Sequence, residues 1–201
     1  QVKEDSYDGM IITGAPVELL DYKDVEYWNE LCTIMDWTET HVRSTYHICW
    51  AAQAGLYHRY GIQKHTLPEK LFGVFPHTAA EGAPLYRGIR GTFYMPHSRH
   101  TDIRREDILK TDGLSILAES PEAGVFSAAD RGCKNIYTFG HGEYDADTLL
   151  REYRRDKAAG YPIAVPKHYF PNGDDTKAPG NLWRETAKMI FTNWLTDFVR
   201  A

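Results

Sequence analysis

"STYHICWAAQAGLYHRYG", residues 44–61, decides the fold, because a single cysteine separates a strand pattern from a helix pattern. Segment 44–49, which leads into the cysteine, is a strand candidate. The alanine-rich segment 50–61 ends at Gly61, as a helix with a glycine stop does. The stretch therefore predicts a strand that runs through Cys49 directly into a helix.

The residues before this stretch repeat the same order of elements. The segment "DGMIITGAP" (8–16) is a short apolar run that stops at a Gly-Ala-Pro turn, which indicates a buried strand. Segment 24–41 carries apolar residues at helical spacing. Strand, helix, strand and helix in succession predict an α/β fold, with a parallel sheet that is covered on both faces.

The residues after this stretch are richer in strand signals. Short runs at 70–77, 91–99 and 113–120 are bounded by Gly, Pro and polar residues, and segment 123–140 predicts a hairpin with its turn near residues 130–132. Helices are expected over 143–160 and 181–200, the second with Leu182, Met189, Trp194, Leu195 and Phe198 facing the body. We find no repeat or linker, so residues 1–201 are expected to form one domain.

The composition excludes several classes of protein. The net charge of −5 favours neither a nucleic-acid nor a membrane partner, since both would select a basic face. No apolar run approaches the roughly 20 residues of a membrane-spanning helix. Three cysteines, odd in number and without paired spacing, fit a reducing cytoplasmic setting better than a disulfide framework.

Cys49 is the first candidate for chemistry. A thiolate between a strand and a helix is stabilised by the positive end of the helix dipole, and the backbone N–H of Trp50 is free to bind an oxyanion. This arrangement is a nucleophile elbow. A generic elbow has small residues two places on either side; Ala51 satisfies that pattern and His47 does not. The alternative is a buried cysteine that packs as a small apolar residue.

The motif "GHGEYD" (140–145) supplies possible partners for the cysteine. It follows a predicted strand, and ligands of doubly wound sheets bind at the carboxyl ends of the strands. His141 is a candidate general base and Glu143 a carboxylate that orients it. The alternative is an exposed turn in which Glu143 caps the next helix. Taken together with Cys49, the motif favours a Cys-His-Glu site.

The turn "TGAP" (13–16) is a second candidate for the oxyanion hole. Gly14 lets the backbone approach a ligand closely, and Ala15 follows it. The alternative is a simple turn at the end of a strand.

The remaining histidines and basic residues carry weaker signals. His97 and His100 have a spacing that metal sites use, but no Cys or carboxylate cluster joins them, so a solvated loop is expected there. Lys70, Arg99 and Arg155 are candidate anion binders, although most basic residues lie on the surface.

Several stretches together resemble one protein family, the homoserine O-acyltransferases of the homoserine transsuccinylase type. Their order along the chain matches from near residue 8 to near residue 195. The stretches are "DGMIITGAPVELLDYKDVEYW", "STYHICWAAQAGLYHRYGI", "EKLFGV", "PHSRHTD", "GHGEYDADTL", "YFPNGD" and "TNWL". The resemblance implies a variant of the class I glutamine amidotransferase fold, with a flavodoxin-like, mostly parallel sheet and helices on both faces.

The resemblance also implies roles for particular residues. Cys49 would be the acyl-accepting nucleophile, His141 the general base and Glu143 its partner. The residues implied to contact substrate are Lys70, Ser98 and Arg155. Two of them, Lys70 and Arg155, suit an amino-acid carboxylate, which arginine can bind through two hydrogen bonds. The implied reaction uses acetyl-CoA as a co-substrate and needs no metal or bound organic cofactor. The resemblance also implies a homodimer.

Glu18 bears on the acyl donor. Succinyl-using members of the family look like "TGAPLGL", whereas this chain has "TGAPVEL". The carboxylate of Glu18 would repel the free carboxylate of a succinyl group, which is selection by exclusion. We therefore expect acetyl-CoA as the donor, with succinyl-CoA as the alternative. The other possibility is that Glu18 points to solvent and selects nothing.

The chain departs from the family pattern in two places. Members often have proline where this chain has Gly142. They also carry early strands before the "DG…TGAP" strand, so we expect this chain to correspond to the C-terminal part of a longer member.

Together these observations predict homoserine O-acetyltransferase activity, with L-homoserine and acetyl-CoA as small-molecule substrates and O-acetyl-L-homoserine, an intermediate of methionine biosynthesis, as product. Two rival hypotheses remain at this point. One is a glutaminase or another cysteine hydrolase on the same fold. The other is a non-catalytic module with a redox-sensing cysteine.

Overall fold

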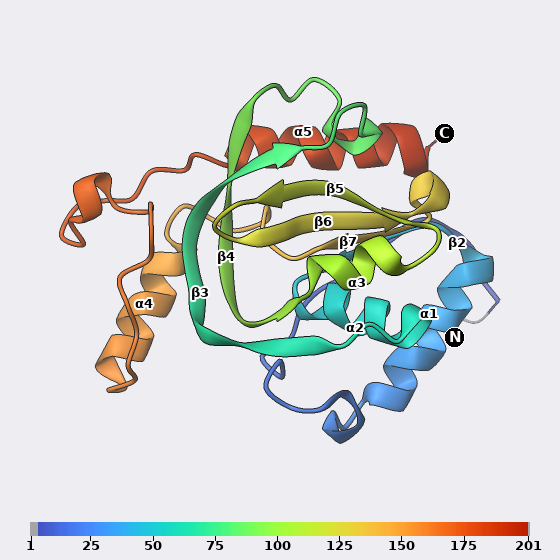
Figure 1. The fold of residues 1–201 in the computed structure, drawn as a ribbon, viewed down its shortest axis with the longest axis horizontal. Coiled ribbons are helices and arrows are strands. Elements are labelled where there is room, and N and C mark those ends of the chain that lie inside the picture. The colour runs from blue at the N-terminus through green and yellow to red at the C-terminus, as the bar shows by residue number, and fades with distance from the viewer. Residues whose placement is uncertain (1–3, 201) are drawn as a thin grey trace.

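The computed structural model describes residues 4–200, which form one seven-stranded sheet with helices on its two faces (Figure 1). The strand order is β1-β2-β7-β6-β5-β3-β4. The strands are β1 (Tyr7–Ile12), β2 (Val42–Ile48), β3 (Lys64–Ala79), β4 (Thr92–Ile103), β5 (Leu114–Ser120), β6 (Gly124–Asp130) and β7 (Asn135–Thr138). The α-helices are α1 (Trp28–His41), α2 (Trp50–Tyr60), α3 (Arg105–Lys110), α4 (Thr148–Ala158) and α5 (Arg184–Trp194), and a π-helical turn, Leu195–Val199, continues α5.

The sheet has a parallel part and an antiparallel part. Strands β1, β2 and β7 run parallel, as the strand–helix order of the first sixty residues predicts. The pairs β7–β6, β6–β5, β5–β3 and β3–β4 are all antiparallel. The prediction of a mostly parallel sheet is therefore wrong for this part of the chain. The physical reason is connection length, because short links such as the one between β5 and β6 return the chain beside itself, whereas parallel pairing needs a long crossover.

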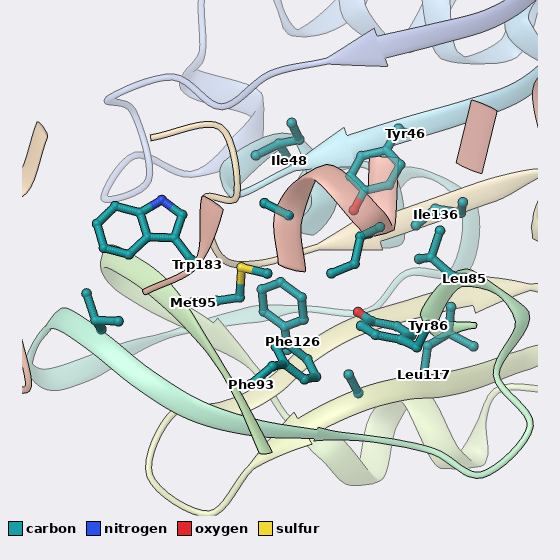
Figure 2. Packing of buried hydrophobic residues seen from close by; sticks show 14 of the residues in the cluster. Tyr46, Ile48, Leu85, Tyr86, Phe93, Met95, Leu117, Phe126, Ile136 and Trp183 are labelled. Carbon is teal, nitrogen blue, oxygen red and sulfur yellow. The ribbon is translucent and has the colours of Figure 1, made fainter. Parts of the chain in front are cut away.

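Alternate residues of the central strands face two different helical layers. Ile136 points to the side that α5 covers, together with Ala187 and Ile190, and its neighbour Tyr137 points to the side of α2. Figure 1 shows α5 along one face of the sheet and α2 and α3 along the other. Figure 2 shows the larger cluster on the α5 side, where rings from several strands meet. The labelled residues there are Tyr46, Ile48, Leu85, Tyr86, Phe93, Met95, Leu117, Phe126, Ile136 and Trp183.

Small residues let α2 pack closely against the sheet. A Cβ atom on Gly55 would lie 2.9 Å from Tyr137 Cε1 and 3.2 Å from His47 Nδ1. The helix ends as the sequence predicts, at Gly61, whose φ of 69° lets its N–H bond back to the carbonyls of Leu56 and Tyr57. This close packing fixes the direction in which α2 leaves the end of β2.

The last helix presents a different face from the predicted one. Its buried residues are Ala187, Ile190, Asn193 and Trp194. Leu182, Met189 and Leu195 are exposed, so only Trp194 and the half-buried Phe198 of the predicted face turn inward. The prediction placed the largest apolar residues on the buried face. It was wrong because the small side chain of Ala187 lets that face of the helix approach the sheet. None of the described helices combines the length and apolar character that crossing a membrane requires.

Candidate active site

Cys49 occupies the turn between β2 and α2, in a backbone conformation that is rare for a residue with a side chain. Its φ is 55° and its ψ is −120°. The Cys49 N–H donates to the carbonyl of Thr138, at the end of the neighbouring strand β7, over 2.7 Å. Positive φ at a non-glycine residue stores strain that the surrounding structure must hold, and such strain gathers at functional sites. The predicted strand–turn–helix unit is thus present, with the cysteine at its tip.

The loop after β1 lies directly against this cysteine. A Cβ atom on Gly14 would be 3.1 Å from Cys49 Cβ and 3.3 Å from the Trp50 nitrogen. Trp50 begins α2, so its N–H has no acceptor within the helix. Ala15 packs at the edge of the cluster that contains Trp50. Two of the residues predicted for an oxyanion hole, Gly14 and Trp50, therefore lie beside Cys49, and Ala15 follows in the same loop.

His141 and Glu143 form a hydrogen-bonded pair at the end of β7. Their Nδ1 and Oε1 atoms are 2.6 Å apart. The His141 N–H also donates to the Pro96 carbonyl over 2.9 Å, which fixes the loop to β4. His141 is buried, whereas the Glu143 side chain is 38% exposed. The turn at Gly142 thus brings two side chains that are two residues apart to the same side.

The groups around His141 act on its pKa in opposite directions. Burial by itself lowers this pKa, but the negative charge of Cys49, a hydrogen bond with Cys49, and Glu143 together raise it to about 10. Glu143 occupies Nδ1, which leaves Nε2 as the ring nitrogen available for the hydrogen bond with Cys49. The order Cys49, His141, Glu143 is the order of a nucleophile, its base and the group that orients the base. Residues 92 positions apart in sequence are therefore brought into contact by the parallel strands β2 and β7.

The other two cysteines differ from Cys49. Burial raises the pKa of Cys133 to about 11, and the charge of Asp130 adds to this effect. Burial and Asp36 also raise the pKa of Cys32, on α1. Cys133 also has a positive φ, 54°, but it precedes strand β7 rather than a helix, and Cys32 lies within α1, so packing explains both. Within residues 4–200 no group of three or more His, Cys, Asp or Glu side chains is placed to hold a metal ion.

Two of the three predicted substrate contacts meet at one carboxylate. Lys70 Nζ on β3 lies 2.5 Å from Glu152 Oε1 on α4, and the Ser98 hydroxyl on β4 donates to the same oxygen over 2.8 Å. Arg155 does not join them directly, because its side chain is 70% exposed and pairs with Asp156 at 2.6 Å. Asp156 in turn lies 3.8 Å from Lys70 Nζ. Helix α4 is thus placed against the β3–β4 pair through charges.

Sequence reasoning missed Glu152 and Tyr144. Glu152 and Asp156 are four residues apart on α4 and so share a face, which was the available signal. The Tyr144 ring stacks on His141, with ring centroids 4.2 Å apart and planes 13° from parallel. Burial raises the pKa of the Tyr144 hydroxyl, and the negative charges of Glu152, Cys49, Glu143 and Glu18 add to it.

Glu18 is therefore within electrostatic reach of the site rather than remote from it. It is half-buried, and its backbone carbonyl accepts a hydrogen bond from Lys64 Nζ over 2.7 Å. Lys64 also donates to the carbonyl of Leu20, at 2.5 Å, and its charge lies 4.5 Å from the centre of the Tyr22 ring. These contacts hold the loop after β1 in place next to the nucleophile.

The structure corrects the predictions for His97 and Arg99. Both are fully buried within β4, not in a solvated loop or on the surface. Arg99 pairs with Asp102 at 2.7 Å, and His97 Nε2 lies 3.0 Å from His77 Nε2. Burial lowers the pKa of His77 to about 3, and a neutral imidazole results. The prediction failed because alternation along β4 turns these polar residues inward, where they satisfy one another.

Comparison with known proteins shows what this chain is similar to. A family model described as homoserine O-succinyltransferase matches residues 1–200. The chain is 54% identical to proteins named homoserine O-acetyltransferase from Clostridium acetobutylicum, over 200 residues, and from Geobacillus kaustophilus, over 199 residues. The alignments cover 99% and 98% of this chain and 66% of each relative. The chain thus spans about two thirds of the length of these relatives.

Solved structures show the same fold at low identity. A glutamine amidotransferase from Thermotoga maritima superposes with a TM-score of 0.68 at 12% identity, covering 97% of this chain and 79% of that one. A second, from Methylobacillus flagellatus, gives a TM-score of 0.67 at 12% identity, with 95% and 77% covered. The predicted class I glutamine amidotransferase-like fold is confirmed.

Proposed function

The chain belongs to the homoserine O-succinyltransferase family, and we propose that it transfers an acetyl group from acetyl-CoA to the hydroxyl of L-homoserine through a thioester on Cys49. The product would be O-acetyl-L-homoserine, an intermediate of methionine biosynthesis. The single observation that supports this proposal best is the contact of Cys49 with His141, itself bonded to Glu143. A covalent intermediate divides one difficult displacement into two easier ones.

In the first half-reaction the Cys49 thiolate attacks the carbonyl carbon of the acetyl-CoA thioester. The negative charge on the carbonyl oxygen is met by the Trp50 N–H and by the Gly14–Ala15 turn, which lies against the cysteine. The tetrahedral intermediate then expels CoA, and the imidazolium of His141 supplies the proton to the leaving sulfur. The enzyme is left acetylated on Cys49, with a neutral His141.

In the second half-reaction His141 acts in the opposite direction. Its Nε2 accepts the proton of the homoserine hydroxyl while that oxygen attacks the acetyl carbon on Cys49. The carbon–sulfur bond breaks, and the Cys49 thiolate returns beside a protonated His141. Glu143 keeps the ring oriented throughout, because it holds Nδ1.

The charges on α4 and the β3–β4 pair suit a zwitterionic acceptor. Lys70 and Glu152 form an ion pair of side chains that are each less than one fifth exposed. An amino acid complements both members, since its carboxylate can bind Lys70 and its ammonium group Glu152. Ser98 lies on the same carboxylate. Arg155 would bind the substrate carboxylate only if its ion pair with Asp156 were broken.

The same charges favour acetyl over succinyl as the transferred group. The charges of Glu18, Glu143 and Glu152 all raise the pKa of the Tyr144 hydroxyl, as does the charge of Cys49, so three carboxylates lie within electrostatic reach of the same tyrosine as the nucleophile. The free carboxylate of a succinyl group would be repelled there, whereas an acetyl group has no charge. The relatives named above as acetyltransferases support this choice, and the family name keeps succinyl-CoA as the alternative.

We further propose that the protein acts as a cytoplasmic homodimer without a bound metal or organic cofactor. Support for the compartment comes from the three cysteines, which are free in the structure. The dimer rests on the family resemblance alone.

The test is the intact mass of the protein after mixing with acetyl-CoA and no acceptor. We expect a mass increase of one acetyl group that is lost when homoserine is added and that is absent in Cys49→Ala. A folded protein that forms no adduct would overturn the proposal. In that case hydrolysis of glutamine would support the cysteine hydrolase, and oxidation of Cys49 without any adduct would support the redox module. Repeating the assay with succinyl-CoA on Glu18→Gly tests the donor, since an unchanged preference would exclude Glu18 as the selector.

A further inference from the structure

Tyr144 covers one face of the His141 imidazole and is unexplained by the chemistry above. The two rings are nearly parallel, 13° apart, with their centroids separated by 4.2 Å. The Tyr144 N–H also donates to the His141 carbonyl over 3.3 Å. The tyrosine and the histidine are therefore parts of one turn, locked to each other by backbone and ring.

The position of the Tyr144 ring is set by its backbone and not by its hydroxyl. The Tyr144 carbonyl accepts a hydrogen bond of 2.9 Å from the indole nitrogen of Trp183, a residue that is 1% exposed. The ring packs against the large apolar cluster. No hydrogen bond joins the Tyr144 hydroxyl to another residue in the stretch 4–200. The fixed feature is thus the ring face that His141 meets.

A ring face at this distance favours the charged form of the imidazole. The π-system of tyrosine carries negative charge on its face, so a cation stacked within about 6 Å of its centre is stabilised. The groups that face His141 are Cys49 from the elbow, Glu143 and Tyr144 from its own loop, and His97 from β4. Burial keeps His97 neutral, and Arg99 beside it has the same effect, so His97 adds no proton-binding partner.

We propose that Tyr144 is a positioning residue whose ring face stabilises the imidazolium form of His141, the form that can hold a Cys49 thiolate beside it. The inference rests on the proposed function in one respect, because it takes Cys49 as the nucleophile. It adds that the aromatic residue after Glu143 sets how much of the resting enzyme is in the reactive ion-paired state. The hydroxyl of Tyr144 is not needed for this effect.

The experiment follows the ring nitrogens of His141 by NMR against pH, in the unaltered protein and in its variants. The nitrogen shifts report the midpoint at which the imidazolium loses its proton. We expect Tyr144→Leu to move this midpoint downward by about half to one pH unit, because the imidazolium loses its stacked partner. Tyr144→Phe should keep the midpoint of the unaltered protein, since phenylalanine presents the same ring face.

Three outcomes would overturn the proposal. They are a folded Tyr144→Leu with an unchanged midpoint, a Tyr144→Phe that moves as far as Tyr144→Leu, and a neutral His141 ring in the nitrogen NMR spectrum of the unaltered protein at neutral pH. The NMR measurement needs no variant, so the proposal stays testable if Tyr144→Leu does not fold. The NMR titration needs no acyl-CoA, so its failure is distinct from a failure to form acetyl-enzyme.

Discussion

The parallel and antiparallel parts of the sheet contribute to the site in different ways. Strands β1, β2 and β7 end side by side, and the residues just beyond their carboxyl ends are Gly14, Cys49 and His141. Strands β3 and β4 instead contribute side chains from within the strands, Lys70 and Ser98, which contact Glu152 on α4. The proposed reacting groups therefore lie at the ends of parallel strands, whereas the groups proposed to bind homoserine lie within the antiparallel strands.

The two parts also differ in what holds them. The reacting loops are fixed by single backbone contacts, such as Cys49 N–H to Thr138 and His141 N–H to Pro96. Beneath the second of these contacts, β4 buries a charged network around Arg99. The antiparallel part therefore supports the parallel part as well as lying next to it. Four substitutions would break or sharpen this division of roles.

The largest effect is expected at the tip of the parallel part. Cys49→Ala removes the proposed nucleophile, so acyl transfer should fall by roughly 10⁴-fold or more, as the loss of other covalent nucleophiles does. Steady-state transfer and intact mass measure it. Cys32→Ala is the matched control, because that cysteine packs on α1, and it should keep its activity. Equal losses in the two variants would contradict the assignment.

The next effect is expected in the support beneath the site. Arg99→Met leaves Asp102 without its buried partner, so the free energy of unfolding should drop by about 3 kcal/mol. Chemical denaturation measures this change. Arg87→Met breaks an exposed ion pair with Asp197 and should cost less than about 1 kcal/mol. If both variants lose the same stability, the buried network is not the support that we describe.

A third substitution tests the close approach of the β1 loop. Gly14→Ala would place a methyl group 3.1 Å from Cys49 Cβ and 3.3 Å from the Trp50 nitrogen, which crowds the expected oxyanion site. Formation of acetyl-enzyme in single-turnover experiments should slow by about 10²-fold, the usual cost of losing one oxyanion donor. Gly180→Ala is the control, since a Cβ there meets no atom within 4 Å. A normal acetylation rate in Gly14→Ala would exclude this loop from the oxyanion hole.

The smallest effect is expected where α4 meets the antiparallel part of the sheet. Glu152→Gln should raise the KM for homoserine by about tenfold, the equivalent of one charge-assisted hydrogen bond. Acetylation of Cys49 should be unchanged, because that half-reaction uses the strand ends. Exposed Glu185, in the first turn of α5, gives the control Glu185→Gln. A slower acetylation step in Glu152→Gln would remove the distinction between the two parts.

Local patterns were sufficient for the parallel part of the fold and for most of the candidate site. The strand pattern before Cys49, the glycine stop at Gly61 and the turn at residues 13–16 are all features of neighbouring residues, and the structure shows each element there. His141 was found because it follows a strand. Glu152 and Tyr144 were missed, since a carboxylate on a charged helix and a tyrosine in a turn look like ordinary surface residues until their partners are known.

Residue types and their order by themselves determined the α/β class, the strand–cysteine–helix unit and the family, because these depend on spacing along the chain. Only the tertiary structure decided which strands pair antiparallel, which face of α5 is buried, and that His97 and Arg99 lie inside. It also decided that Gly14, Cys49 and His141 meet, together with the ring of Tyr144. These outcomes depend on contacts between residues far apart in sequence, and the free energy of such contacts is set by packing and burial rather than by local preference.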